Sequence, residues 1–426
     1  MPVALIVQKY GGTSVADPER MRRVARHVAD ARAEGHELVV VVSAMGKATD
    51  NLIELARQVS ADPPGREMDM LLTTGERISM SLLCMALHDV GVEAVSFTGS
   101  QVGIITDTSH TRAKILEVRG DRVREALAAG KVAVVAGFQG VSVDREITTL
   151  GRGGSDTTAV ALAAAFRADA CEIYTDVTGV FSADPRLVPQ ARKLAWLQFD
   201  EMLEMAGAGS KVLALRAVEF ARNHQVPIHV RSSFTWEPGT WVSDERPEGA
   251  RGKDGAMEEP VISGVVHDAS EAKVTVQSVP DRPGVSAAIF EPLAAAGVNV
   301  DMIVQNTSTA GTTDVSFTCP TSDLARAEAI VRGVAADIGA GAVTHDDGIA
   351  KISLVGAGMK SSPGIAARMF RVLADRGVNI EMISTSTIRI SVVVAAPMLE
   401  TAVRALHTAF DLDSGSDYSA PLPERK

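Results

Sequence analysis

The chain has 426 residues, of which 46% are hydrophobic and 22% are charged, and its formal net charge is −11. This length supports two or three domains with a substantial core, and an acidic chain without a basic stripe is not expected to bind nucleic acid or an anionic membrane. The three widely spaced cysteines, Cys84, Cys171 and Cys319, indicate neither a disulfide framework nor a zinc site. With neither a secretory signal nor an apolar run of membrane-spanning length, we expect a cytoplasmic protein with reduced thiols.

The first 242 residues alternate short apolar runs with amphipathic segments. After the apolar run VALIV, a helix is expected over 18–33, with Asp17 as its N-cap and Pro18 as its first residue. Further strands are expected at 38–44, 94–99, 132–138, 171–177 and 226–233, and further helices at 67–89 and 210–223, while 146–166 reads as strand, glycine turn and helix. The alternation predicts an α/β sandwich with a mainly parallel sheet.

The texture of the sequence changes after Trp241. Residues 243–260 are charged and rich in glycine and proline, which is typical of a linker. Beyond it, 281–303 aligns without gaps on 361–383, and each copy carries a Pro-Gly turn and an amphipathic helix between strands. This repeat predicts two ferredoxin-like βαββαβ units. We therefore expect a first domain over 1–242, a linker over 243–262, and two repeat units over 263–344 and 345–420, the second completed by a strand from before the first.

Four loops rich in glycine or hydroxyl side chains follow predicted strands. They are KYGG (9–12), SAMG (43–46), GRGGSD (151–156) and YTDVTGVFSADPR (174–186). One such loop is explained equally well as a tight turn. Loops at the carboxyl ends of parallel strands share one crevice, however, and glycines let backbone amides approach an anion closely. With Lys9, Arg152 and Lys211 in or near these loops, the four together predict a site for two anions.

At this point the chain resembles the amino-acid kinase superfamily, and within it the aspartate kinases. The segments that carry the resemblance are KYGGTSVAD, SAMGKATD, TTGERIS, GFQG, TTLGRGGSDTTA, YTDVTGVFSADPR and GSKVL, in that order. The repeat is similar to the tandem ACT domains of the same enzymes. The resemblance implies an amino-acid-kinase αβα sandwich followed by two ACT domains. It also implies transfer of the ATP γ-phosphoryl group to L-aspartate, giving 4-phospho-L-aspartate, the first step toward lysine, threonine and methionine.

The resemblance implies four catalytic residues, and their chemistry suits the reaction. The carboxylate of aspartate is ionised at pH 7, so positioning and charge neutralisation matter more than a general base. Lys9 is expected to stabilise the transferring phosphoryl group, and Asp156 to orient Lys9. Glu76 is expected to take the substrate ammonium and Arg152 a substrate carboxylate. Read without the resemblance, Glu76 is equally a surface carboxylate and Asp156 a first-turn carboxylate that satisfies the helix dipole.

Further binding residues are implied by the same resemblance. The nucleotide is expected to contact Lys9, Tyr10, Gly11, Gly12, Ser43, Thr175, Asp176, Phe181, Asp184, Arg186 and Lys211. The substrate is expected to contact Thr49, Asp50, Glu76, Arg152, Gly153, Gly154 and Ser155. ATP is expected with Mg²⁺ carried on its phosphates, because no cage of carboxylates is evident in the sequence.

Tandem ACT domains imply feedback inhibition by lysine, threonine or both. The effector residues implied are Asp281, Gly284, Asn299, Asp301, Gln305, Asn379 and Ile380. In the second copy Ser361 replaces Asp281 and Glu381 replaces Asp301, so we expect two inequivalent sites. Exposed sheet edges in the ACT units predict a homo-oligomer. An α2β2 assembly, with a second subunit started at Met257, is an open alternative.

Two other functions fit part of the sequence. A kinase acting on glutamate or acetylglutamate would share the glycine loops and lysines, although the tandem repeat and GRGGSD disfavour it. An amino-acid sensor with an inactive kinase part would keep the repeat, but Lys9 and Arg152 are both present.

Overall fold

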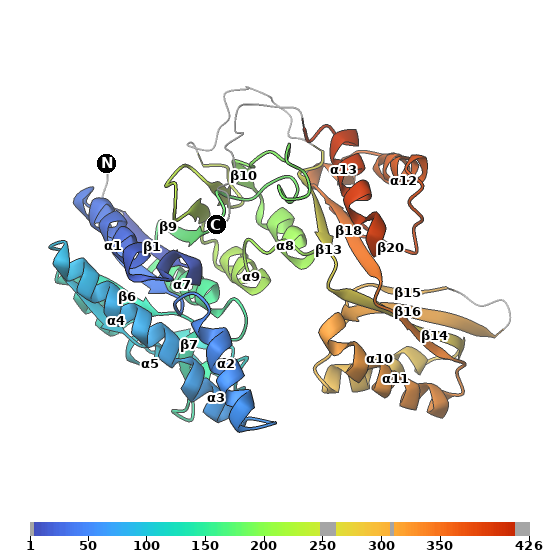
Figure 1. Cartoon of the computed structure of the whole chain (residues 1–426), viewed down its shortest axis with the longest axis horizontal. Coiled ribbons are helices and arrows are strands. Elements are labelled where there is room, and N and C mark those ends of the chain that lie inside the picture. The colour runs from blue at the N-terminus through green and yellow to red at the C-terminus, as the bar shows by residue number, and fades with distance from the viewer. Residues whose placement is uncertain (1–3, 248–260, 307–310, 414–426) are drawn as a thin grey trace. The chain divides into compact units, whose positions relative to one another are not determined.

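The computed structural model describes residues 4–247, 261–306 and 311–413. The chain forms two compact units (Figure 1). Among the described residues, the first unit comprises 4–180, 193–206 and 211–247, and the second comprises 181–192, 207–210, 261–306 and 311–413.

The first unit is built on an eight-stranded sheet in the order β10-β12-β11-β9-β1-β2-β6-β3. All neighbours pair in parallel except β11 and β12, which confirms the predicted, mainly parallel sheet. Its strands are β1 (Leu5–Tyr10), β2 (Glu37–Val42), β3 (Ala94–Phe97), β6 (Val132–Ala136), β9 (Ala170–Thr175), β10 (Trp196–Leu197), β11 (Ile228–Ser232) and β12 (Thr240–Val242). Helices cover the central strands on both faces, so β2 and β6 are almost wholly buried, as their unbroken apolar runs predict.

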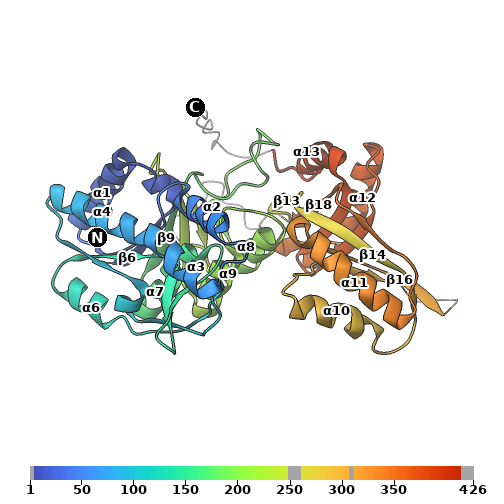
Figure 2. The same ribbon diagram turned by 60° about the horizontal axis from the view of Figure 1, so that its bottom comes forward.

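Helices α1 (Pro18–Ala33) and α4 (Thr74–Asp89) pack together over the sheet (Figure 2). Val24 and Leu83 meet Val40 of β2 in one apolar core. On the other side of β1, α7 (Gly154–Phe166) packs against α9 (Leu215–His224). Since α7 also contacts β1 and β9, it places its N-terminus at the carboxyl ends of these strands.

Several elements differ from the predictions. The helix expected over 67–89 is two helices, α3 (Gly65–Leu72) and α4, and the helix expected from 210 begins only at Leu215. Four further α-helices of the first unit were not predicted: α2 (Ala48–Val59), α5 (Gly99–Val102), α6 (Asp121–Ala128) and α8 (Phe199–Gly207). Because it contains glycine, the SAMG segment (43–46) was interpreted as a loop. Helix α2, whose residues have an amphipathic pattern, begins shortly after it.

A small second sheet in the first unit has the order β5-β4-β7-β8. It contains β4 (Ile104–Thr106), β5 (Ile115–Val118), β7 (Gln139–Ser142) and β8 (Ile147–Thr149), and only β8 was expected from the sequence. β8 leads directly into the glycine turn before α7, so this sheet supports one of the predicted site loops.

One described stretch, Gly65–Asp89, has the length and apolar composition of a membrane span. More than half of its most apolar window, 56%, is buried inside the protein, which is the behaviour of a core helix.

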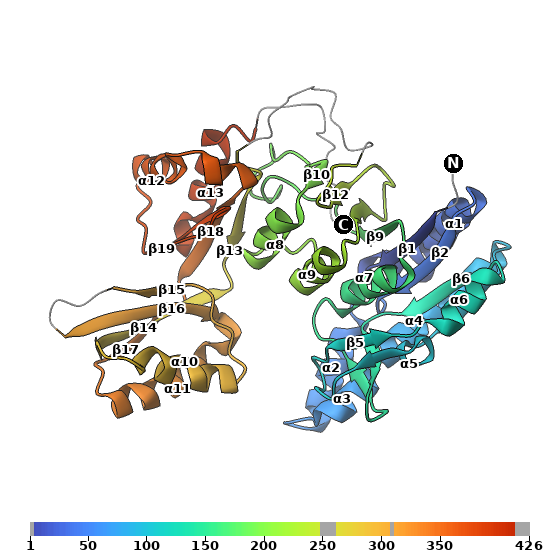
Figure 3. The ribbon, with the colours of Figure 1, turned by 180° about the vertical axis from the view of Figure 1, so that it is seen from behind.

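The second unit contains two four-stranded antiparallel sheets, β15-β16-β14-β17 and β13-β18-β20-β19 (Figure 3). The first is formed by β14 (Glu271–Pro280), β15 (Ile303–Gln305), β16 (Thr312–Pro320) and β17 (Val343–Asp346), with helices α10 (Val285–Ala295) and α11 (Leu324–Ile338). The second is formed by β13 (Gly264–Asp268), β18 (Ile349–Val355), β19 (Met382–Thr385) and β20 (Arg389–Ala395), with α12 (Ile365–Asp375) and α13 (Leu399–Ala409). These are the predicted ferredoxin-like units.

The repeat is visible in the backbone of the second unit. Gly284 and Gly364 precede α10 and α12 with φ angles of 94° and 95°, a left-handed conformation that favours glycine. Strand β13 comes before the first repeat copy in the sequence, but it pairs with β18 of the second repeat copy. The domain boundaries stay predictions, and segment 181–192, which lies inside the expected first domain, packs with the second unit.

Candidate active site

Lys9 and Asp156 form an ion pair at the carboxyl end of β1. The Lys9 Nζ lies 2.7 Å from Asp156 Oδ1, and the two side chains are only 12% and 13% exposed. Lys9 is the penultimate residue of β1, and Asp156 lies in the first turn of α7, which packs on that strand. An ammonium has three donors, so Lys9 can keep Asp156 as a partner and still bind a phosphate oxygen. The structure brings these two predicted residues together.

The glycines after β1 allow a close backbone approach. A Cβ on Gly12 would lie 2.8 Å from the carbonyl oxygen of Ala44, in the loop that follows β2. The Gly11 amide, which we expected to face phosphate, instead donates to the Tyr174 carbonyl at 3.1 Å. The close packing of the two loops therefore explains Gly12, and the Gly11 amide already has a partner.

Glu76 is buried, not a surface carboxylate. It is 3% exposed in the first turn of α4, and its Oε1 accepts a hydrogen bond from the Ala44 amide at 3.2 Å. Its Oε2 is also buried, and no described residue donates to it. Burial raises the pKa of Glu76 to about 7. A buried carboxylate oxygen without a donor favours a cationic or hydrogen-bonding ligand.

The predicted nucleotide residue Ser43 and the predicted substrate residues Thr49 and Asp50 lie on two different elements after β2. Ser43 follows the strand, and its amide donates to the Tyr10 carbonyl at 3.1 Å. Thr49 and Asp50 lie in the first turn of α2, not in a loop. The N-terminus of α2 is the positive end of the helix dipole, and it lies close in the sequence to Ser43.

The turn that carries Arg152 depends on glycine. Gly151 and Gly153 have φ angles of 77° and 72°, and a Cβ on Gly153 would lie 2.3 Å from that of Ala214. Gly154 and Ser155 are buried where α7 begins. Arg152 itself is exposed, and within the described part of the chain its guanidinium has no recorded hydrogen bond or ion pair. It is thus available to a ligand.

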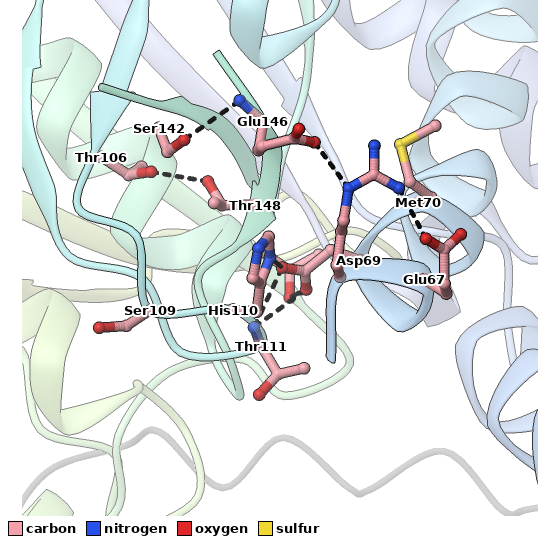
Figure 4. Close-up of polar contacts among 12 residues, drawn as sticks. Glu67, Asp69, Met70, Thr106, Ser109, His110, Thr111, Ser142, Glu146 and Thr148 are labelled. Carbon is pink, nitrogen blue, oxygen red and sulfur yellow. Dashed lines mark hydrogen bonds and ion pairs between the residues drawn. The ribbon is translucent and has the colours of Figure 1, made fainter. Parts of the chain in front are cut away.

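Sequence reasoning missed Asp69, a fully buried residue of α3 that supports this turn (Figure 4). Its carboxylate accepts from the hydroxyl of Thr149 at 2.5 Å and from the Thr111 amide at 3.0 and 3.1 Å, and it bonds to His110 Nδ1 at 2.7 Å. Thr149 is the last residue of β8, three positions before Arg152. Thr111 has a φ of 65°, a costly conformation for a β-branched residue. Asp69 therefore holds a strained loop against the glycine turn.

Arg216, in the first turn of α9, also binds both the loop that contains Thr111 and the glycine turn after β8. Its guanidinium donates to the carbonyls of Leu150 and Ala113, both at 2.8 Å. In the sequence, the only sign of a role for Asp69 or Arg216 was a charged residue inside a helix pattern.

The predicted nucleotide residues are spread over both units. Tyr10 is fully buried and stacks on Tyr174 at 4.8 Å within the core, so its ring is not available to a ligand. Lys211 is exposed in the loop before α9, not at the helix start we expected. Thr175 ends β9 and donates to Asp176 at 3.2 Å. The other three, Phe181, Asp184 and Arg186, belong to the second unit, where Arg186 forms a bidentate pair with Asp184.

The effector residues lie where the two sheets of the second unit meet, or on exposed turns. Lys351 is 1% exposed and pairs with Asp301, at 2.5 Å, and with Glu271. Asp301 is therefore already bound to a cation. Gln305 accepts from Ser286 at 3.1 Å. Asp281, Gly284, Asn299 and Asn379 are exposed, and Ile380 is half-buried against the core of the second sheet. Met257 lies outside the described residues.

A cavity of about 630 Å³ lies elsewhere in the first unit, beside α1. Gln8, His27, Glu172 and Arg231 line it, and none of the predicted substrate residues does. Among the described residues, no group of three or more histidine, cysteine or acidic side chains is arranged to hold a metal ion.

Comparison with known proteins covers almost the whole chain. Residues 4–232 match the model of the amino acid kinase family, and residues 273–336 and 352–410 match two ACT domain models. An aspartokinase of Mycolicibacterium smegmatis is 55% identical over 96% of this chain and 97% of its own length.

Solved structures agree with these matches. The structure of E. coli aspartokinase III in complex with aspartate and ADP is 26% identical, with a TM-score of 0.80, over 95% of this chain and 99% of that one. The same enzyme in complex with lysine and aspartate is 25% identical, with a TM-score of 0.73, over 95% of this chain and 99% of that one.

Proposed function

Because the chain belongs to the aspartokinase family, we propose that it transfers the γ-phosphoryl group of ATP to the β-carboxylate of L-aspartate. The product is 4-phospho-L-aspartate, and ATP is used as its Mg²⁺ complex. The observation that carries the proposal is the Lys9–Asp156 pair, a nearly buried cation held at 2.7 Å by a carboxylate at a helix start. E. coli aspartokinase III, whose structure contains aspartate and ADP, supports the choice of substrates.

In the proposed step, a β-carboxylate oxygen of aspartate forms a bond to the γ-phosphorus. The bond between that phosphorus and the β–γ bridging oxygen breaks, and ADP leaves with the electron pair. No proton is transferred, because the nucleophile is already ionised. Lys9 stabilises the charge on the transferring group, and Asp156 fixes the position of Lys9.

Selection of aspartate is assigned to Glu76 and Arg152. The Oε2 atom of Glu76 is buried without a donor, so an ammonium group would satisfy it. Arg152 is exposed on a rigid turn and offers a planar fork to a carboxylate. Acetylglutamate has no ammonium group, so the buried carboxylate disfavours it as the substrate.

Regulation is proposed through the ACT units, with lysine, threonine or both as inhibitors. Support comes from a difference between the two copies: Asp301 shares the buried Lys351 with Glu271, whereas Glu381 pairs with the more exposed Lys273. E. coli aspartokinase III, whose structure contains lysine, is a related example. We further propose a homo-oligomer, with an α2β2 assembly as the alternative, and a cytoplasmic location consistent with three buried, free cysteines.

The test is trapping of the acyl phosphate as its hydroxamate, with MgATP and one amino acid at a time. Hydroxamate should form with L-aspartate and not with L-glutamate or N-acetyl-L-glutamate. It should fall when lysine, threonine or both are added. Product from glutamate but not from aspartate would show that the chain is a kinase acting on glutamate. No product from any of the three amino acids would favour an amino-acid sensor with an inactive kinase part.

A further inference from the structure

Glu172 is a buried carboxylate of β9 that the proposed phosphoryl transfer does not use. Its side chain is only 10% exposed, and both of its oxygens accept hydrogen bonds. Oε2 accepts from Gln8 Nε2 and from the Tyr174 hydroxyl, both at 2.9 Å, and Oε1 accepts from Arg231 Nη1 at 3.0 Å. Burial alone would raise the pKa of Glu172, but these donors and His229 lower it to about 2. The carboxylate is therefore ionised and fully paired.

The hydrogen bonds of Glu172 extend to both neighbours of Lys9 in β1. The Tyr10 hydroxyl donates to Gln8 Oε1 at 3.2 Å, and the Tyr10 ring stacks on that of Tyr174. Successive side chains of a strand point to opposite faces of the sheet. Gln8 and Tyr10 point to the face that α1 covers, whereas Lys9 points to the face of α7, where it pairs with Asp156. The contacts of the two flanking side chains thus fix the direction of Lys9.

The apolar residues around β1 do not define its alignment by themselves. Strand β2, which pairs with β1, has the sequence ELVVVV and is buried almost throughout, so a shift by one residue would still place apolar residues against valines. The polar side chains are specific, because Gln8 lies opposite Glu172 in the parallel pairing of β1 with β9. A shift by one residue would separate them and turn Lys9 toward α1.

Packing on the α1 side does not replace these hydrogen bonds. Gln8, Glu172 and Arg231 line the cavity of about 630 Å³ beside α1, so the network borders a cavity on this side. A fully paired network of polar side chains makes the local structure rigid and specific. The orientation of β1 at this point therefore depends on directional bonds to Glu172.

We propose that Glu172 is a positioning residue for phosphoryl transfer, because it holds β1, through Gln8, in the alignment that directs Lys9 to Asp156 and to the transferring group. This inference rests on the role proposed above for Lys9. Glu172 lies on the opposite face of the sheet from Lys9, so it acts on the reaction only through the strand.

The test measures hydroxamate formation by the full-length enzyme in two variants. Gln8→Met removes the link to β1 and leaves Glu172 paired with Arg231, and Glu172→Gln removes the charge with little change of shape. We expect kcat to fall by about 10- to 10²-fold in both variants, with both KM values within about twofold of wild type, because a displaced cation costs mainly transition-state stabilisation. Asp169→Asn is the control, since Asp169 accepts from the first amide of β1 at 2.8 Å, at the other end of the strand. Its kcat should match wild type.

Combination with Lys9→Met separates a positioning role from a general loss of structure. If Glu172 acts through Lys9, adding Gln8→Met to Lys9→Met should change kcat by less than about twofold, because the two losses are not additive. A further loss of about tenfold in the double variant would overturn the inference, and so would a folded Gln8→Met with the kcat of wild type.

If Glu172→Gln does not fold, Gln8→Met decides, because it keeps the buried ion pair of Glu172 with Arg231. Failure of the proposed function is distinguishable from failure of this inference. In the first case the wild-type enzyme forms no hydroxamate from aspartate, whereas in the second the wild type is active and the variants of the network behave like the control.

Discussion

Lys9 is the residue on which the account of phosphoryl transfer depends. In the proposed mechanism its ammonium stabilises the transferring group, and Asp156 Oδ1 lies 2.7 Å from it. Lys9→Met should lower kcat for hydroxamate formation by about 10²–10³-fold, the usual cost of losing one group that stabilises transition-state charge. Lys131→Met is the matched control, since Lys131, just before β6, pairs with the exposed Glu93 and lies outside the candidate site. Equal activity in the two variants would remove Lys9 from the mechanism.

Glu76 gives the enzyme a predictable pH dependence. With a pKa of about 7, Glu76 becomes neutral below that pH and loses the charge that its proposed pairing with the substrate ammonium requires. We expect kcat/KM for aspartate to fall as pH drops from 8 to 6, and Glu76→Gln to give a low, flat profile over this range. Kinetics at saturating MgATP measure this. A wild-type profile that stays flat across pH 6–8 would contradict the assignment.

The same pKa predicts a stability effect. The folded-state pKa of Glu76 lies above the ordinary value of 4.5, so the folded protein binds more protons between these values. Stability therefore decreases as pH rises from about 4.5 to about 7 through this group, and the loss is complete above pH 7. Glu76→Gln should be more stable than wild type at pH 8 and should lose this dependence, as chemical unfolding at several pH values would show.

At the residue scale, the sequence predicts groups whose neighbours in the chain are distinctive. Lys9 precedes two glycines and Asp156 follows three, so their loops could be recognised and their meeting inferred. Asp69 could not be recognised in this way, because its partners Thr111 and Thr149 lie 42 and 80 residues away. From the sequence alone, a carboxylate within an apolar helix pattern cannot be identified as buried or exposed. That depends on its partners, which here lie far away in the chain.

At the element scale, Asp69 links α3, the loop before β5 and the end of β8. Asp69→Asn keeps the shape of the side chain but replaces one carboxylate oxygen with an NH₂ group. This group is a donor, so it cannot accept a hydrogen bond from the Thr111 amide. We expect a KM for aspartate about tenfold higher, an unchanged KM for MgATP, and a loss of about 1–3 kcal/mol in the free energy of unfolding.

The control for Asp69 is Glu146→Gln, which breaks an exposed ion pair with Arg66 in the same cluster (Figure 4). Steady-state kinetics and urea unfolding on both variants measure the effect. A rise in both KM values for Asp69→Asn, or an equal effect of Glu146→Gln, would show that Asp69 has no particular link to the turn of Arg152.

Element boundaries were harder to predict than element types. The break between α3 and α4 falls at Thr73, whose φ and ψ of −63° and −13° remain near-helical, so the apolar period runs on almost undisturbed. Helix α9 begins four residues after Lys211, because Ala214 takes an extended conformation before it. Strand β13 pairs with β18 across the whole first repeat, a pairing that no local pattern fixes.

At the scale of the whole molecule, a buried charge cluster joins the two sheets of the second unit. Lys351 of β18 occupies the position in the second copy that Lys273 occupies in the first, and it binds both Glu271 of β14 and Asp301. Removing the cation would leave two carboxylates unpaired. Lys351→Met should therefore lower the free energy of unfolding by about 3–5 kcal/mol.

Lys273→Met is the comparison for this prediction, because Lys273 pairs with Glu381 and its side chain is 22% exposed, against 1% for Lys351. Its cost should be at most about 1 kcal/mol. Guanidinium unfolding of the two variants measures the difference. Similar costs would mean that the cluster around Lys351 does not hold the sheets together.

In the proposed reaction this chain makes an acyl phosphate on aspartate, and Lys9 is the cation that stabilises the transferring phosphoryl group. ³¹P NMR of the enzyme with MgATP and L-aspartate follows this reaction directly. We expect an acyl-phosphate resonance that grows in step with ADP and does not appear with Lys9→Met. ADP without an acyl phosphate, or the same resonance at the same rate from Lys9→Met, would contradict it.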